Sequence, residues 1–312
     1  MLLAPSILYR LSLKSKLKKI DQYNVKSIRS RVDYYNKINE EFQLSENAVT
    51  NNELFFNQML KLKKRFVNKI SVKKRTTYFF DLFSVFSFFP KHKKLDYKFG
   101  DITHTFRSPT IVKSRPILNS KNSVIMGLNK VRHFNFIEDP INFSEKKDMA
   151  VWRGYAKNSE NREYFIKNYY DVPTFDIGQH APKVNEPWHR PYMPISEQLR
   201  FKFIFCIEGA DTATNIKWVM SSNSVCVMPK PKYETWFMEG KLKPDFHYIC
   251  LKDDFSDAEE KINFFIKHPD HVKKIISNAN DYVEQFKNKR KEKLISLLVL
   301  DKYFSYSKDH SS

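Results

Sequence analysis

The sequence predicts an α/β protein, with a sheet of mostly parallel strands in the second half and a helical, strongly basic N-terminal region before it. Beyond about residue 95, short apolar runs alternate with polar turns and amphipathic stretches, as in parallel sheets joined by helices. Residues 11–75 combine Lys, Glu and Asn with spaced apolar residues, a pattern typical of amphipathic helices. All six glycines lie between Gly100 and Gly240. Because glycine permits close approach of the backbone to a ligand, the functional loops are expected in the middle of the chain.

The composition is that of a globular protein with room for two domains. The chain has 312 residues and is 41% hydrophobic, which excludes a disordered polypeptide. Cys206, Cys226 and Cys250 stand singly in apolar runs and are expected to be buried thiols in a reducing compartment. The histidines of "HPDH" (268–271) fit a surface loop better than a zinc site. The chain start does not resemble a signal peptide, and no run of about 20 apolar residues occurs, so we expect a cytoplasmic protein.

The charge is large and uneven. Lys and Arg number 54 against 35 Asp and Glu, a formal charge of +19. Residues 1–99 hold 21 Lys and Arg and 8 Asp and Glu, so this third alone carries +13. Such a surface attracts nucleic acid, an anionic membrane or a phosphorylated glycolipid. Solvated lysines on helix faces would give the same composition, and both interpretations stay open.

Further elements follow in order along the chain. The Phe-rich stretch 76–90 ends at Pro90 and predicts a buried strand or helix, with a hydrophobic patch for a membrane or partner as the alternative. The proline-rich segment 176–196 predicts a long loop. Later, "HYICLKDD" predicts a strand, residues 256–269 a helix capped by Ser256, and residues 270–304 one or two long helices.

The stretch "IEGADTATNIKWVMSSNS" (207–224) predicts a strand, loop, helix and strand in succession. A strand at 203–207 leads into Gly209, which permits a turn, and Thr212 or Thr214 can cap a helix that runs to about Ser222. A second strand is expected at 224–228. Ligands of open α/β sheets bind beyond the carboxyl ends of the strands, and free N–H groups at a helix start suit a phosphate.

Two further stretches carry candidate chemistry. In "VWRGYAKNSENRE" (151–163), Arg153 and Arg162 flank a glycine turn and could clamp a diphosphate, or they could be surface residues that pair with Glu160 and Glu163. In residues 97–117, Asp101 follows a predicted strand, and Lys113 and Arg115 follow the next one. Asp101 could act as a general base, or it could simply occupy a turn.

Several familiar motifs are missing. The chain has no Asp-x-Asp pair, with which many nucleotide-sugar enzymes hold a divalent metal. A departing diphosphate would then depend on Arg, Lys and helix N–H groups. The chain also lacks the motifs G-x-x-x-x-G-K-[ST], G-x-G-x-x-G and G-x-S-x-G. Their absence argues against a kinase, a dinucleotide-binding enzyme and a hydrolase.

Taken together, the stretches "IVKSRPI", "RHF", "VWRG", "SEQLRFKFIFCIEGADTATNIKWVMSSNS", "YETWFMEGKLKPDFHYICLKDDF" and "ISNANDYVEQF" resemble glycosyltransferase family 90. The similarity covers about residues 95–290 and is strongest to the bacterial lipopolysaccharide group. The resemblance implies a GT-B fold, in which two Rossmann-like domains face a cleft. It also implies an inverting, metal-independent transfer from a UDP-sugar.

The resemblance also implies domain functions. A helical, basic region at 1–95 and the segment 96–148 would form the acceptor domain with the catalytic base. Residues 149–290 would form the nucleotide-sugar domain, and 291–312 a C-terminal helix and tail.

Specific residues match family positions. Asp101 matches, by its order along the chain, the Asp that serves as the base in animal relatives. Where those relatives place a diphosphate-binding Arg, this chain has Asn215, so Lys217 or helix N–H groups must carry more of the charge. Lys113 and Arg115 are expected near the diphosphate or the acceptor. The predicted donor-binding residues are Arg153, Gly154, Arg162, Glu197, Gly209, Asp211, Thr212, Asn215, Lys217 and Glu234.

The sequence therefore favours an enzyme that moves a hexose from a UDP-sugar to the inner core of lipopolysaccharide. It would need no cofactor or metal, could associate with the anionic inner face of the cytoplasmic membrane, and would bind no specific nucleic acid. A capsule polysaccharide or a protein hydroxyl is the alternative acceptor. A basic protein that binds nucleic acid or membrane without catalysis is the remaining alternative.

Overall fold

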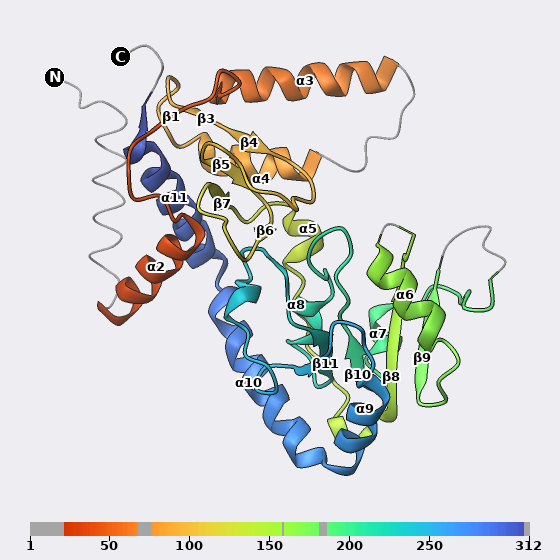
Figure 1. The fold of residues 1–312 in the computed structure, drawn as a ribbon. Coiled ribbons are helices and arrows are strands. Elements are labelled where there is room, and N and C mark those ends of the chain that lie inside the picture. Colours follow the sequence, from red (N-terminus) through yellow and green to blue (C-terminus); the bar gives the residue numbers. More distant parts are fainter. Residues whose placement is uncertain (1–21, 68–75, 158, 181–185, 309–312) are drawn as a thin grey trace. The chain divides into compact units, whose positions relative to one another are not determined.

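The computed structural model describes residues 22–67, 76–157, 159–180 and 186–308 (Figure 1). Residues 1–21 and 68–75 of the predicted helical region, 181–185 of the predicted loop and 309–312 of the predicted tail lie outside the described residues. The chain forms two compact units. Unit 1 contains the described residues up to Lys130 together with those from Lys289 onward, and unit 2 contains Val131–Asn288. The functions assigned above to chain segments stay predictions.

Unit 2 is built on a five-stranded sheet in the order β13-β11-β10-β8-β9. Its strands are β8 (Lys147–Gly154), β9 (Phe175–Gln179), β10 (Phe201–Phe205), β11 (Val225–Pro229) and β13 (Ile249–Leu251). Every neighbouring pair is parallel. The near-continuous apolar sequences of β10 and β11 suit strands that are covered on both faces. The predicted parallel α/β sheet is thus confirmed.

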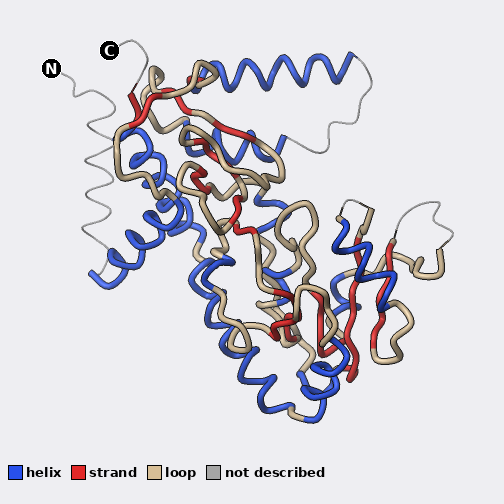
Figure 2. The backbone as a smooth tube through the Cα atoms, in the orientation of Figure 1, coloured by secondary structure: helices blue, strands red, loops and turns tan. Residues whose placement is uncertain are grey.

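Helices cover this sheet (Figure 2). They are α6 (Glu160–Tyr169), α9 (Ala258–Lys267) and α10 (Pro269–Lys287), with the short helices α7 (Ile195–Gln198) and α8 (Ile216–Val219) and the 3-10 turns η1 (Phe143–Glu145) and η2 (Glu239–Lys241). The ring of Phe165 on α6 packs 4.8 Å from that of Phe205 and 4.9 Å from that of Phe255, between centroids. Helix packing therefore seals the apolar face of the sheet.

Three local predictions were wrong. The start of the expected loop 176–196 is strand β9, because "FDIGQ" pairs with β8 from Ala150↔Phe175 to Gly154↔Gln179. Helix α9 is capped at Asp257 and not at Ser256, whose backbone N–H instead donates to Asp254 in the preceding turn.

The third error concerns the loop after β10. Helix α8 is a single turn with Asn215 at its N-cap, so neither Thr212 nor Thr214 caps a helix. The Asn215 side chain donates to the Phe205 carbonyl oxygen at 2.9 Å and makes no capping bond. The polypeptide after β10 is therefore mostly loop, tied back to the end of its own strand.

Unit 1 combines helices with small sheets. Its helices are α2 (Gln22–Tyr35), α3 (Asn51–Val67), α4 (Thr76–Phe86) and α11 (Lys289–Tyr306), and the four-residue α5 (Lys130–His133) begins at its boundary. A three-stranded parallel sheet joins β4 (Tyr97–Lys98), β5 (Thr110–Val112) and β7 (Ser123–Ile125). Two pairs of two-residue strands complete this part: β1 (Phe42–Gln43) with β14 (Ser307–Lys308), and β2 (Val49–Thr50) with β3 (Lys94–Leu95). The short strand β6 (Arg115–Pro116) also belongs to unit 1, whereas the short strand β12 (Tyr233–Glu234) belongs to unit 2.

The last helix of the chain closes the core of unit 1. Glu292 on α11 forms an ion pair with Arg31 on α2, with Nη1 and Oε1 2.6 Å apart. The Tyr303 hydroxyl accepts from the Asp96 N–H at 3.1 Å and donates to the Pro109 carbonyl oxygen at 2.9 Å. The first and last parts of the chain are therefore one folding unit. None of the helices in the described ranges is long and apolar enough to cross a bilayer.

Candidate functional site

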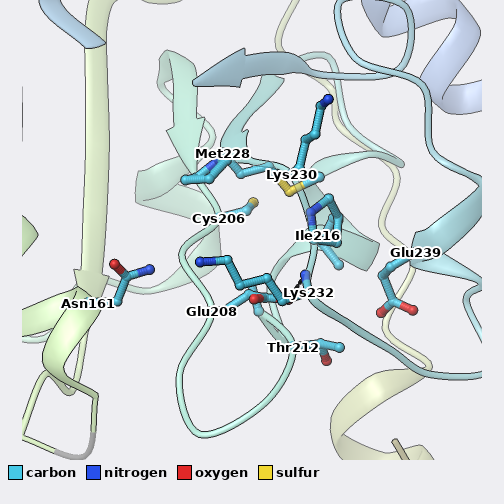
Figure 3. Close-up of a pocket in the computed structure, with 12 residues that line it drawn as sticks. Asn161, Cys206, Glu208, Thr212, Ile216, Met228, Lys230, Lys232 and Glu239 are labelled. Atoms are coloured by element: carbon cyan, nitrogen blue, oxygen red, sulfur yellow. Dashed lines mark hydrogen bonds between the residues drawn. The ribbon is translucent and has the colours of Figure 1, made fainter. Parts of the chain in front are cut away.

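A pocket opens in unit 2 where β10 and β11 end (Figure 3). Because parallel strands place their carboxyl ends at one edge of the sheet, the segments that follow both strands meet there. Asn161 from the first turn of α6 and Glu239 from η2 complete the wall. The polar residues that line the pocket are Asn161, Cys206, Glu208, Thr212, Lys230, Lys232 and Glu239.

The loop after β10 is held from behind by α6. Arg162 donates from Nε and Nη2 to the Ile207 carbonyl oxygen at 3.1 and 2.8 Å, and from Nη1 to that of Tyr155 at 3.3 Å. A Cβ at Gly209 would lie 2.9 Å from Cζ of Arg162. Gly209 is therefore needed for the close approach of this guanidinium group. Gly209 does not have a positive φ; among the described residues, Gly100 is the glycine that has one.

Glu208 is one of the titratable residues that line the pocket. Its carboxylate accepts hydrogen bonds from the backbone N–H groups of Lys232 at 3.1 Å and Tyr233 at 3.2 Å. Burial, together with the nearby carboxylates of Glu239 and Asp211, raises the pKa of Glu208 to about 7 despite these two bonds. Glu208 can therefore accept or donate a hydrogen bond near neutral pH. It was not among the predicted site residues, although its position directly after a buried strand pointed to it.

A buried ion pair adjoins the pocket, because one of its members, Glu239, lines the pocket wall. Nζ of Lys217 is 2.6 Å from Oε1 of Glu239, and the two side chains are 0% and 2% exposed. Glu239 also accepts from the Thr235 N–H at 2.6 Å and from the Thr235 hydroxyl at 2.9 Å. The ammonium of Lys217, predicted to meet the diphosphate, is thus engaged by a carboxylate within the protein. Glu239 was missed because the two residues are 22 positions apart.

Two lysines supply positive charge at the pocket mouth. Lys230 and Lys232 follow β11 directly, both are exposed, and both line the pocket. Lys232 lies 3.1 Å from Asp253 in a solvent-exposed ion pair. Both were missed in the sequence, although "PKPK" after an apolar run was the available signal. They are the cations of this pocket best able to meet an anionic ligand.

The predicted diphosphate clamp has protein partners. Arg153 at the end of β8 forms an ion pair with Asp176 and donates to the carbonyl oxygens of Trp152 and Asp176, each at 3.0 Å. The alternative pairing with Glu160 and Glu163 is not what the structure shows for this side chain. A Cβ at Gly154 would lie 2.7 Å from the Trp152 ring, so this glycine serves close packing. The donor-binding role of Arg153, Gly154 and Arg162 stays a prediction.

The remaining predicted donor-binding residues differ in whether they lie at the pocket. Thr212 lines the pocket and is buried, and its Oγ1 has no hydrogen-bond partner within the described residues. Asp211 is buried beside it, and its carbonyl oxygen accepts from the Gly209 N–H at 3.0 Å. Glu197 is exposed on α7, whereas Glu234 is buried on β12. Neither glutamate belongs to the pocket lining.

The predicted base belongs to unit 1. Asp101 follows Gly100, whose φ is 120°, and its carboxylate lies 2.5 Å from Nζ of the buried Lys113. The Asp101 side chain is 38% exposed, so solvent can reach it. Arg115 is completely buried and donates to the carbonyl oxygens of Tyr34, Tyr35 and Ser123 at 2.7–3.0 Å. Arg115 therefore links the end of α2, at Tyr34 and Tyr35, to Ser123 at the start of β7, and Lys113 holds Asp101.

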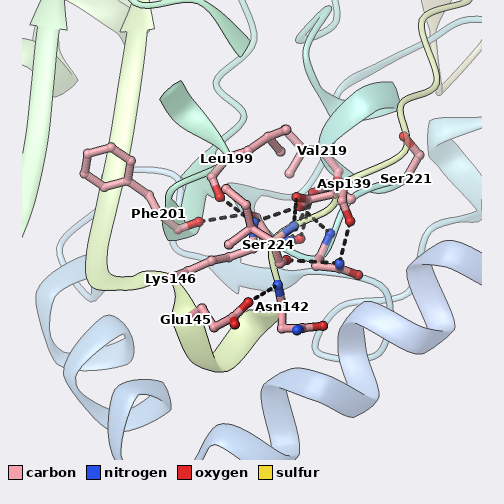
Figure 4. Close-up of polar contacts among 12 residues, drawn as sticks. Asp139, Asn142, Glu145, Lys146, Leu199, Phe201, Val219, Ser221 and Ser224 are labelled. Carbon is pink, nitrogen blue, oxygen red and sulfur yellow. Dashed lines mark hydrogen bonds and ion pairs between the residues drawn. The ribbon is translucent and has the colours of Figure 1, made fainter. Parts of the chain in front are cut away.

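A second polar cluster lies at the opposite edge of the sheet in unit 2 (Figure 4). Asp139 forms a buried ion pair with Lys146, 2.7 Å between Oδ2 and Nζ, and accepts from the Asn223 N–H at 2.9 Å. Ser224 donates to the carbonyl oxygen of Phe201, the first residue of β10, at 2.8 Å. Because these groups satisfy one another, we assign the cluster a structural role. In the part of the chain that is described, no group of three or more His, Cys, Asp or Glu side chains could hold a metal ion.

Comparison with known proteins gives the family. The family model of glycosyl transferase family 90 matches residues 71–303, beyond the 95–290 of the resemblance at both ends. "O-glucosyltransferase LpsA" of Dichelobacter nodosus is 39% identical over 281 residues, covering 89% of this chain and 83% of that protein. "Uncharacterized protein 179R" of Invertebrate iridescent virus 6 is 29% identical over 158 residues, 47% of this chain and 13% of that protein. The chain belongs to glycosyltransferase family 90 and is a glycosyltransferase.

Proposed function

We propose that this enzyme transfers a hexose from a UDP-sugar to a saccharide of the lipopolysaccharide core, with inversion and without a metal ion. The name of the D. nodosus relative, an O-glucosyltransferase, favours glucose as the hexose. The proposed architecture is GT-B, with unit 2 as the donor domain and unit 1 as the domain that carries the base. The proposed location is the inner face of the cytoplasmic membrane.

The pocket at the ends of β10 and β11 carries this proposal. Lys230 and Lys232 place two ammonium groups at its mouth, where they can neutralise a diphosphate. Glu208 offers a carboxyl group to the ribose hydroxyls, and the Thr212 hydroxyl offers a further hydrogen bond. In this assignment, two solvent-exposed lysines neutralise the diphosphate, a role that the sequence had suggested for Lys217.

The proposed chemistry is a single displacement. The acceptor oxygen forms a bond to the anomeric carbon as the bond from that carbon to the UDP oxygen breaks. Asp101 takes the proton of the acceptor hydroxyl, and the leaving electron pair stays on UDP, where the two lysines stabilise it. Lys113 orients the Asp101 carboxylate through the 2.5 Å contact.

Calorimetric titration with a panel of UDP-sugars tests which donor the enzyme binds.

The kcat/KM for transfer tests the pocket. Lys230→Met and Lys232→Met are compared with Lys267→Met, which removes an exposed lysine on α9 outside the pocket. We expect the pocket variants to lower kcat/KM roughly 10- to 100-fold, because each removes a charge-assisted hydrogen bond, and the control to match the parent. Equal activity of all three variants would place the diphosphate elsewhere.

Two additional arms test the acceptor and the metal. Core oligosaccharide, capsule polysaccharide and a hydroxyl-bearing protein are offered as acceptors with UDP-glucose and UDP-galactose. The proposal predicts UDP release with the core saccharide, and rejection of that acceptor in favour of another would refute it. Activity is expected to survive EDTA. Loss on chelation with recovery on added Mg²⁺ or Mn²⁺ would contradict the metal-independent mechanism.

A further inference from the structure

Unit 1 exposes a group of large apolar side chains on two neighbouring helices. Phe55, Phe56 and Leu60 on α3 are 40, 64 and 58% exposed, and Phe80 on α4 is 57% exposed. We call these four residues the α3–α4 aromatic surface. Large exposed apolar side chains that gather in one place mark an interaction site more often than scattered ones do.

The rings of this surface form a connected series across the two helices, which lie near each other in Figure 1. Phe55 contacts Phe56 and, on α4, Phe83, with ring centroids 6.1 and 5.8 Å apart. Phe79 stacks on Phe83 at 5.3 Å and meets Phe80 at 5.1 Å. Phe79 is only 1% exposed. The exposed rings are thus anchored to the buried core and keep their outward positions.

The same helix is rich in positive charge. Lys61 is exposed directly after Leu60, and the sequence of α3 also contains Lys63, Lys64 and Arg65, against Glu53 as its one acidic residue. An anionic lipid surface attracts such a segment, by about fivefold in binding for each Lys or Arg near the surface. Phenylalanine and leucine beside lysine are typical of helices that lie in the headgroup region of a bilayer.

Charge also argues against a second copy of the chain as the occupant. Self-association through α3 would bring two strongly basic helices together, and the chain as a whole carries +19. An anionic bilayer complements that charge, and its acyl chains accept protruding rings without a matching pocket.

We propose that the α3–α4 aromatic surface docks on an anionic lipid bilayer, with its aromatic and leucine side chains in the interface and Lys61 against the lipid headgroups. This inference adds to the proposed function the surface that brings the enzyme to a lipid-anchored acceptor. Only the identity of that acceptor rests on the proposed function.

Vesicle co-sedimentation of the full chain tests the inference. Phe56→Ser/Leu60→Ser is compared with Leu118→Ser, which removes a 78% exposed apolar side chain elsewhere in unit 1. We expect the parent and Leu118→Ser to bind phosphatidylglycerol vesicles and the double variant to bind at least about tenfold more weakly, since each buried Phe or Leu contributes a factor of this order. High salt should weaken the binding, and phosphatidylcholine vesicles should bind poorly.

Three results would overturn the inference. They are equal binding by the double variant and the parent, equal binding of the parent to anionic and neutral vesicles, and a parent dimer in sedimentation velocity that the double variant loses. Thermal unfolding checks that the double variant is folded. UDP release with a water-soluble core oligosaccharide is measured separately. Vesicle binding without transfer refutes the proposed function alone, and transfer by a parent that does not bind vesicles refutes the docking surface alone.

Discussion

Replacing Lys217 with methionine would break the buried pair behind the pocket. Lys217 and Glu239 are almost fully buried and 2.6 Å apart, so the substitution leaves a carboxylate in the interior without its cation. Removal of one partner of such a pair typically costs about 3–5 kcal/mol. Thr235 still donates two hydrogen bonds to Glu239, and we therefore expect the lower end, about 3 kcal/mol.

Tryptophan fluorescence offers a direct assay. The four tryptophans of the chain, Trp152, Trp188, Trp218 and Trp236, all belong to unit 2, so their emission during urea unfolding follows the unit that holds the pair. The double variant Lys217→Met/Glu239→Gln removes both charges and should recover at least half of the lost free energy of unfolding.

A loss below about 1 kcal/mol in the single variant, or no recovery in the double variant, would refute this reasoning. A stable single variant with weaker UDP-sugar binding would show instead that Lys217 contacts the donor, as the sequence suggested.

Three other changes are expected to have measurable effects. Because the pKa of Glu208 is raised in the folded protein, the stability that its protonated form contributes is complete below about pH 4.5 and is lost as the pH rises toward 7. Relative to the parent, Glu208→Gln should therefore gain roughly 2 kcal/mol in free energy of unfolding between those pH values, measured by urea unfolding. Equal pH profiles of the two proteins would contradict this. Gly209→Ala forces the Arg162 guanidinium group, 2.9 Å from the new Cβ, off its carbonyl partners and should cost about 1 kcal/mol, visible as a lower Tm. Asp101→Asn should lower kcat at least about 100-fold while calorimetric donor affinity stays unchanged, and a fully active variant would remove Asp101 from the mechanism.

The sheet of unit 2 was predictable because its strands can be recognised from their own local sequence. "FKFIF" and "VCVMP" are continuous apolar runs bounded by polar loops, and they became β10 and β11 within two residues of the expected positions. Strand β9 was missed because its neighbouring prolines suggested a loop, whereas pairing with β8 decided its conformation. Tertiary pairing overrides local composition in such cases.

The site was only partly predictable for a similar reason. The sequence marks which residue types follow each strand, and Thr212 does line the pocket. It does not show which partners the charged side chains will meet. Arg162 is held by the carbonyl oxygen of Ile207, 45 residues away, and Arg153 by Asp176, 23 residues away. Those contacts depend on strand register and helix packing. The sequence alone therefore does not distinguish cationic side chains that pair within the protein from those that stay available to a ligand.

Unit 1 takes its last helix, α11, from the end of the chain, and this has a consequence for synthesis on the ribosome. Unit 2 is one continuous segment, Val131–Asn288, and can fold as soon as it emerges. Helix α4 must wait, because its Phe86 stacks on Phe304, with ring centroids 5.7 Å apart. A nascent chain therefore carries the uncovered face of α4 through most of translation. Premature termination before α11 should leave a folded unit 2 joined to an aggregation-prone N-terminal segment.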